Sequence, residues 1–149
     1  MNINPISFKG VTKITGNRPL ASANRISDII NHNENCKTET EKKIAKRFSC
    51  KETRCEATSI TFNQGKSAYV VTGKECQQLK ELSNYMDSYV ETASKVYGKG
   101  SDMAKIIAEC EMDRFYDLAK IIVIDQEDAT LDINYDDSTN KINSLNLIL

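Results

Sequence analysis

The order of hydrophobic and polar residues in the middle of the chain predicts two short strands followed by a long helix. Residues 57–62 alternate as a half-buried strand does, and residues 68–71 are apolar on both sides, as in a strand inside a sheet. An apolar stripe with three- and four-residue spacing then predicts a helix over residues 74–97. We expect the rest of the chain to be built around this hairpin and helix.

A second long helix is expected after Gly98 and Gly100, which break the first one, with Ser101 as its N-cap. Its apolar positions are Met103, Ile106, Ile107, Cys110, Phe115, Leu118 and Ile122. The short connection predicts that the two helices pack antiparallel and cover the sheet. Residues 121–124 could end this helix or form a further strand, and their β-branched side chains favour the strand.

Two further stretches with helical or strand character complete the chain. Ile26, Ile29 and Ile30 predict a short helix within residues 20–33. Alternation at Leu131, Ile133 and Tyr135, and again over 142–149, predicts a C-terminal hairpin. Thr38 with Glu41, and Thr72 with Glu75, have the spacing of capping boxes at helix starts.

These elements predict one α+β domain over residues 1–149. We expect an antiparallel sheet with two long antiparallel helices packed on one face. Residues 1–19 are an extended arm or edge strand, residues 20–56 a peripheral helical and basic segment, and residues 57–149 hold the hairpin, the two helices and the C-terminal strands.

The stretch from Asn4 to Gly10 resembles the start of a scattered set of small bacterial proteins that open with a Pro-x-x-Phe-x-Gly pattern and have no assigned activity. The resemblance covers one end of the chain and implies at most a shared address or docking tag. It implies no cofactor and no catalytic residue. An ordinary N-terminal strand is the alternative.

Length and composition favour a globular domain rather than a disordered or membrane-spanning chain. The 149 residues are 40% hydrophobic and 28% charged. No apolar run approaches the roughly 20 residues that cross a bilayer. The N-terminus lacks the charged and apolar regions of a secretory signal, so a cytoplasmic location is expected.

Charge divides the chain into a basic and an acidic half. Residues 1–74 hold 13 Lys and Arg against 6 Asp and Glu, a net of +7, whereas residues 75–149 hold 7 against 15, a net of −8. Either the halves neutralise each other in the fold or a basic face remains for an acidic partner.

A zinc site is the candidate with paired spacing. Three residues separate the single histidine, His32, from Cys36, and four residues separate Cys50 from Cys55. Structural zinc takes four such ligands from two close pairs. Reduced thiols in a loop-rich region are the alternative, because no Cys-x2-Cys knuckle is present.

Two positively charged places could bind an anion or a partner. Gly73 and Lys74 begin the long helix, where amides and the helix dipole attract negative charge. Residues 37–54 hold seven basic residues, Lys42, Lys43, Lys46 and Arg47 among them, against three acidic ones. Interspersed carboxylates and few aromatics make nucleic-acid binding there a weaker expectation than a solvated helix.

Enzyme motifs are incomplete. A nucleophilic cysteine would have to share His32 as its base, and Gly65-Lys66-Ser67 lacks the first glycine of a phosphate loop. An enzyme with scattered groups would need a pocket lined by residues such as Lys74 or Tyr69. We therefore expect a small non-enzymatic protein that acts through protein–protein contacts. A zinc-stabilised domain that binds nucleic acid through residues 37–54 is the alternative.

Overall fold

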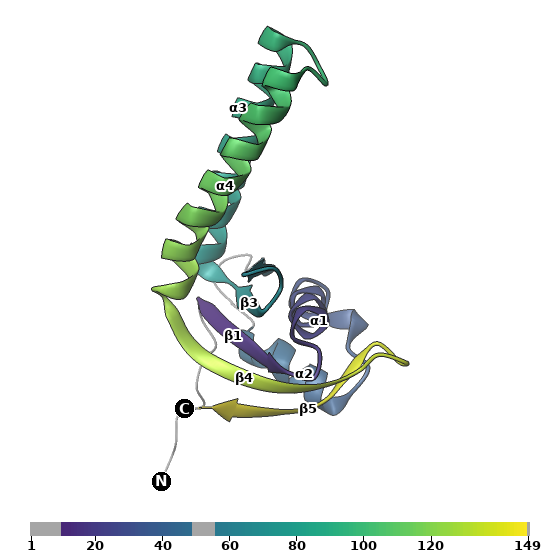
Figure 1. The fold of residues 1–149 in the computed structure, drawn as a ribbon. Coiled ribbons are helices and arrows are strands. Elements are labelled where there is room, and N and C mark those ends of the chain that lie inside the picture. Colours follow the sequence, from purple (N-terminus) through teal and green to yellow (C-terminus); the bar gives the residue numbers. More distant parts are fainter. Residues whose placement is uncertain (1–9, 49–55, 149) are drawn as a thin grey trace.

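The computed structural model describes residues 10–48 and 56–148. In chain order the elements are β1 (Val11–Gly16), α1 (Pro19–Asn31), the 3₁₀ turn η1 (Asn33–Asn35), α2 (Glu39–Phe48), β2 (Thr58–Phe62), β3 (Ser67–Val71), α3 (Gly73–Tyr97), α4 (Asp102–Ile124), β4 (Glu127–Asp136) and β5 (Lys141–Ile148). Figure 1 shows a curved sheet with helices beside it and a long helical hairpin that projects away from it. The predicted α+β class is confirmed.

The five strands form a mixed sheet in the order β2-β3-β1-β4-β5. Three neighbouring pairs are antiparallel, but β1 runs parallel to β4, with Ile14 opposite Leu131. The expected all-antiparallel sheet is wrong for that pair. β1 is also the central strand, which corrects the prediction that residues 1–19 form an arm or an edge strand. Most of the Pro-x-x-Phe-x-Gly stretch lies outside the described residues.

One face of the sheet carries the main core. Ile26 and Ile29 of α1 are fully buried there, with Ile14, Val70 and Leu131 from three strands. α1 therefore belongs to the core, which corrects the expectation that residues 20–56 are wholly peripheral. α2 is the outer helix of this layer, and its buried Ile44 and Phe48 complete the core.

The other face of the sheet holds a smaller core at the base of the helical hairpin. Strand residues Val11, Tyr69 and Val71 pack there against Leu79 of α3 and Val123 of α4. The helices are antiparallel as predicted (Figure 1), and the Ser101 hydroxyl caps α4 by accepting a hydrogen bond from the Ala104 amide at 3.2 Å. Residues 121–124 end α4, so the strand expected there is wrong.

The two predicted capping boxes have different outcomes. Thr38 caps α2, because its hydroxyl accepts from the Glu41 amide at 3.1 Å. The Thr72 hydroxyl makes no such bond and instead accepts from the Gly10 amide at 3.1 Å, which extends the pairing of β1 with β3. Within the described residues, no helix combines the length and the apolar character needed to cross a membrane.

Candidate functional site

The hairpin of α3 and α4 is longer than the sheet can cover. Its 25-residue first helix extends about 37 Å at the usual helical rise, whereas a five-residue strand spans about 17 Å. The part near the sheet is buried, at Cys76, Leu79, Ala119 and Val123. Beyond it, Ala93 and Ala104 are buried where the two helices meet. Most of the hairpin therefore exposes its outer sides.

Large apolar side chains follow one stripe on each helix of the hairpin and stay exposed. On α3, Tyr85, Tyr89 and Val96 recur at spacings of four and seven, and Val96 is 69% exposed. On α4, Ile106 and Ile121 are 54% and 60% exposed. We call this set the apolar face; its members are Tyr85, Tyr89, Val96, Met103, Ile106, Leu118 and Ile121.

A groove between the helices shows that both stripes lie on the same side of the hairpin. Its volume is about 180 Å³, and Leu82 and Tyr85 of α3 line it together with Arg114 and Leu118 of α4. The α4 stripe borders Arg114 and Leu118, because Ile121 follows them by seven and three residues. Two stripes on one side form one continuous surface instead of two separate ones.

The opposite side of the hairpin faces the body of the protein near its base. Tyr116 makes edge-to-face ring contacts there with Phe62 and Phe115. A second cavity, of about 360 Å³, lies between β2, the start of α1 and the hairpin, and Ile60, Lys80 and Tyr116 are among its lining residues. Lys80 pairs with Glu56 beside this cavity.

Charge is unevenly distributed along the hairpin. Residues 95–105, which we call the tip, hold Lys95, Lys99 and Lys105 against Asp102, a net of +2. Residues 81–94 and 106–119, which we call the middle, hold seven acidic residues against Arg114, a net of −6. Lys95 pairs with Glu91 at 3.3 Å, and Lys105 lies on the Tyr116 side of α4, because eleven residues complete about three helical turns. Lys99 in the loop is the remaining basic residue of the tip.

The basic candidates of the sequence lie on the solvent side of α2. Lys42, Lys43, Lys46 and Arg47 are exposed, and Lys42 pairs with Glu39 at 3.3 Å. Lys37 donates to the Thr139 carbonyl at 3.4 Å, and the basic residues at 51 and 54 lie outside the described residues. The exposure of these side chains fits a solvated helix face, which is one of the two interpretations of this segment. Partner binding there stays a prediction.

The predicted anion site at the start of α3 has acidic surroundings. Gly73 and Lys74 are exposed. Burial, together with the carboxylates of Glu75 and Glu127, raises the pKa of the nearby Asp128 carboxyl to about 6. A site with three carboxyl groups disfavours a bound anion. Anion binding at Gly73 and Lys74 stays a prediction. The structure does not show Gly73 next to the basic residues of α2.

The predicted zinc ligands are split between described and undescribed parts of the chain. His32 and Cys36 flank the turn η1. The exposed His32 ring lies 3.8 Å from Glu34, whereas Cys36 packs partly buried against the main core, where burial raises the pKa of its thiol. Cys50 and Cys55 lie outside the described residues, and the described ones contain no cluster of three metal-binding side chains.

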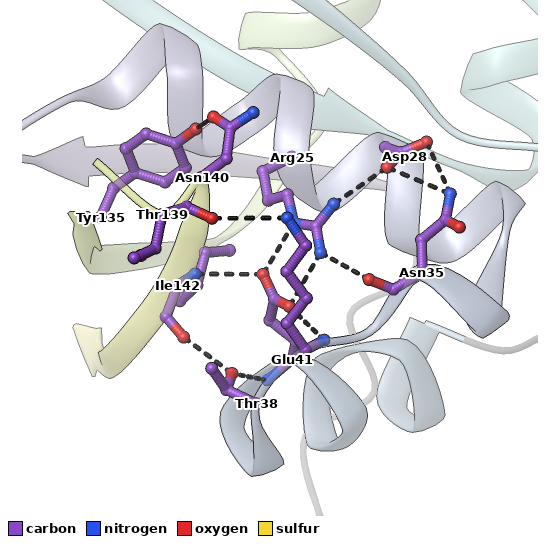
Figure 2. Close-up of polar contacts among 10 residues, drawn as sticks. Arg25, Asp28, Asn35, Thr38, Glu41, Tyr135, Thr139, Asn140 and Ile142 are labelled. Carbon is purple, nitrogen blue, oxygen red and sulfur yellow. Dashed lines mark hydrogen bonds and ion pairs between the residues drawn. The ribbon is translucent and has the colours of Figure 1, made fainter. Parts of the chain in front are cut away.

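A buried ion pair that the sequence patterns did not indicate joins α1, α2 and β5 (Figure 2). The Arg25 guanidinium donates to both carboxylate oxygens of Glu41, at 2.7 and 2.9 Å. The Glu41 carboxylate also accepts from the amides of Lys37 and Ile142, at 2.7 and 3.0 Å. Arg25 further bonds Asp28 and the Asn35 carbonyl. The carboxylate oxygens of Glu41 and the N–H groups of Arg25 bond to other groups of the protein. This cluster therefore holds α1, α2 and β5 together and does not bind a ligand.

The pKa of Glu41 shows which effect dominates at this pair. Burial raises it, but the bonds from Arg25, Lys37 and Ile142 outweigh burial and hold the pKa below its ordinary value. Tyr69, which the enzyme alternative placed in a pocket, has its pKa raised by burial and by Glu127. Tyr69 is 4% exposed within the smaller core and is not among the lining residues of the two cavities described above.

Comparisons with known proteins found nothing similar to this chain. The chain matches no protein-family model, and no curated protein or solved structure is significantly similar to it.

The apolar face could have been anticipated from two signals in the sequence. The apolar positions of residues 74–97 cover more of the helix circumference than one partner helix can bury, since Tyr85 and Tyr89 stand beside the stripe of Leu82, Met86 and Val90. The expected helix was also longer than any expected strand. Helical periodicity alone predicts that every apolar position of the helix is buried in the core.

Proposed function

We propose that this protein acts through protein–protein contacts and that the apolar face of the hairpin is its contact surface. The observation that carries the proposal is the set of exposed tyrosine, methionine and aliphatic side chains on one side of a projecting hairpin (Figure 1). Contiguous exposed apolar surface of this kind marks interaction sites, because leaving it in water costs free energy that a partner recovers.

The composition of the face supports this function over a ligand site. Tyrosine and methionine are enriched in the centres of interfaces, and Arg114 beside the groove supplies a group that often anchors partners. The sequence predicted contact surfaces at the N-terminal stretch and at residues 37–54. The hairpin is the better-supported surface, because it presents exposed apolar side chains, whereas the described part of residues 37–54 presents exposed charged ones.

A non-enzymatic role and a cytoplasmic location belong to the same proposal. The observation that supports a non-enzymatic role is the pairing of Lys80, in the larger cavity, with Glu56. The zinc-stabilised, nucleic-acid-binding alternative stays a prediction that depends on Cys50 and Cys55. Zinc content and thiol reactivity of the purified chain test it.

Position-resolved photocrosslinking in the cells that make the chain tests the proposal. A photoreactive phenylalanine analogue replaces Tyr89 on the apolar face or, as the matched control, Tyr116 on the other side of the hairpin. We expect a discrete adduct from position 89 that Ile106→Asp abolishes and Ser88→Asp leaves intact. Ser88 is one residue before Tyr89 and is therefore turned about 100° away from the stripe.

Two results would reject the proposed function. One is the lack of any discrete adduct at position 89, and the other is an equal set of adducts at positions 89 and 116. The mass of the adduct also reports the partner, because a second copy of the chain gives twice the mass of one.

A further inference from the structure

We propose that the occupant of the apolar face is a second copy of this chain, docked antiparallel so that the tip of each hairpin lies against the middle of the other. This inference rests on the proposed function and specifies its partner. Three features of the hairpin support it: the complementary charges of tip and middle, the relative heights of residues on the two helices, and the area of the face.

The charges favour one orientation of two identical hairpins. A two-fold pairing places the same surface on both copies, so each contact occurs twice. In the antiparallel arrangement Lys99 in the tip of one copy meets Glu81 and Asp117 in the middle of the other. In a parallel arrangement the two tips meet and place Lys99 of one copy against Lys99 of the other. Opposite charges steer and register an interface, whereas like charges oppose it.

The levels of residues along the hairpin place the two-fold axis. α3 ends at Tyr97 and α4 begins at Asp102, so Tyr89 lies about as far from the connecting loop as Cys110, an exposed thiol of α4. With the two-fold axis at this level, each tip lies beside a point on the partner's hairpin that is about 12 Å from Tyr89, toward the partner's sheet, given the usual helical rise per residue. Glu81 and Asp117 of the partner lie at that level, so their carboxylates face the basic tip.

The face is large enough for a reversible dimer. Two adjacent helices present a surface about 20 Å wide, and the overlap described above is about 25 Å long. Such an overlap covers about 500 Å² on each copy, or about 1,000 Å² in total, at the lower limit for a specific interface. We therefore expect a dimer that forms at micromolar concentration and dissociates on dilution.

Sedimentation equilibrium of the full chain is the first test. We expect the mass to rise with concentration from 16.7 kDa, the mass of one chain, to twice that value. Replacing Lys95, Lys99 and Lys105 by Glu changes the tip from +2 to −4 and is expected to weaken the dimer at least tenfold. The matched control replaces the exposed Lys42, Lys43 and Lys66 by Glu, which gives the same net charge and leaves the dimer intact.

Thiol crosslinking then tests the orientation. A short bis-maleimide should link Cys110 to Cys110 of the second copy, identified as a linked peptide by mass spectrometry. In a Cys110→Ser background, Lys99→Cys should not link to itself but should link to Asp117→Cys when the two variants are mixed. Self-linking of Lys99→Cys would overturn the antiparallel arrangement.

The outcomes separate the two proposals. A chain that stays at 16.7 kDa at all concentrations, while position 89 crosslinks to a different protein in cells, would overturn self-association and keep the proposed function. A monomer with no adduct at position 89 would overturn both. Equal loss of the dimer in the tip variant and in its charge-matched control would reject the tip-to-middle contact.

Discussion

Glu41 is a buried carboxylate whose partners come from three separate elements. Its side chain is fully buried and contacts Arg25 of α1, while its oxygens also accept from Lys37 and from Ile142 of β5. The Thr38 hydroxyl donates to the Ile142 carbonyl at 2.8 Å (Figure 2), so the start of α2 is tied to β5 twice. Local sequence periodicity cannot reveal such a pair, because the two charges stand 16 positions apart.

We expect Glu41→Gln to destabilise the fold. Arg25 would keep a buried charge without its carboxylate, which typically costs about 3 kcal/mol. For a chain of this size that corresponds to a melting temperature lower by about 6–12 °C. Calorimetry checks it, with Glu39→Gln on the exposed side of α2 as the control. A shift no larger than that of the control would contradict this description of the pair.

The lowered pKa of Glu41 also predicts how stability responds to acid. The folded state holds the charged carboxylate more strongly than the unfolded state, whose pKa is about 4.3. The stabilisation is therefore present above that pKa and is lost as the pH falls through the folded-state pKa. Denaturant titrations between pH 7 and pH 2.5 should show a smaller acid-induced loss in Glu41→Gln than in the unchanged chain.

Gly16 is expected to tolerate no side chain. Its φ is +122°, and an added Cβ would lie 2.0 Å from the Ile133 carbonyl oxygen of the neighbouring strand. Gly16→Ala should cost at least about 3 kcal/mol, from strain and from separation of β1 and β4. Gly65→Ala, at φ +85° but in open space, should cost about 1 kcal/mol. Equal costs by denaturant unfolding would show that the close approach does not matter.

At the scale of elements, the sequence predicted the helices well and the strand pairing only in part. The three-residue spacing of Ile26 and Ile29 and the Ser101 cap are local signals, and both agree with the structure. The pairing of β1 with β4 joins residues more than 110 positions apart, which no local pattern encodes. Residues 121–124 show the opposite case. Their β-branched side chains favour a strand, but they form the end of the long helix α4.

The hairpin should behave as two regions with different energetics. Leu79 at the base is 4% exposed, so Leu79→Ala should cost about 2–4 kcal/mol by leaving a cavity. Ile106→Ala on the apolar face should change the monomer's stability by no more than about 0.5 kcal/mol. Chemical denaturation at high dilution compares the two. A large loss in Ile106→Ala would mean that this side chain packs within the monomer.

At the scale of the whole molecule, the fold separates a compact body from a projecting contact element. The mixed sheet with α1 and α2 holds the main core, while the hairpin base rests on the smaller one. The two halves of the chain meet in the body, where Asp137 of the negative half pairs with Arg18 of the positive half at 3.5 Å. The acidic middle of the hairpin lies away from α2 (Figure 1).

Ionic strength should weaken the association of two chains. Contacts between the tip and the middle are solvent-exposed charge pairs, and salt screens these over about 8–10 Å at 0.1–0.15 M. We expect the dissociation constant from sedimentation to increase several-fold between low and high salt. A dimer that salt strengthens would be held by apolar contact alone and would contradict the charge-based register.

Oxidative footprinting inside the cell measures most directly whether the apolar face is covered. Hydroxyl radicals modify exposed tyrosine and methionine, and the hairpin supplies both on each side. Tyr85, Tyr89 and Met103 lie on the apolar face, whereas Tyr116 and Met112 are exposed outside it. We predict slow modification of the first set and fast modification of the second, with the difference lost in dilute purified protein. Modification of both sets in proportion to their exposure in the isolated chain would contradict the claim that this face is a contact surface.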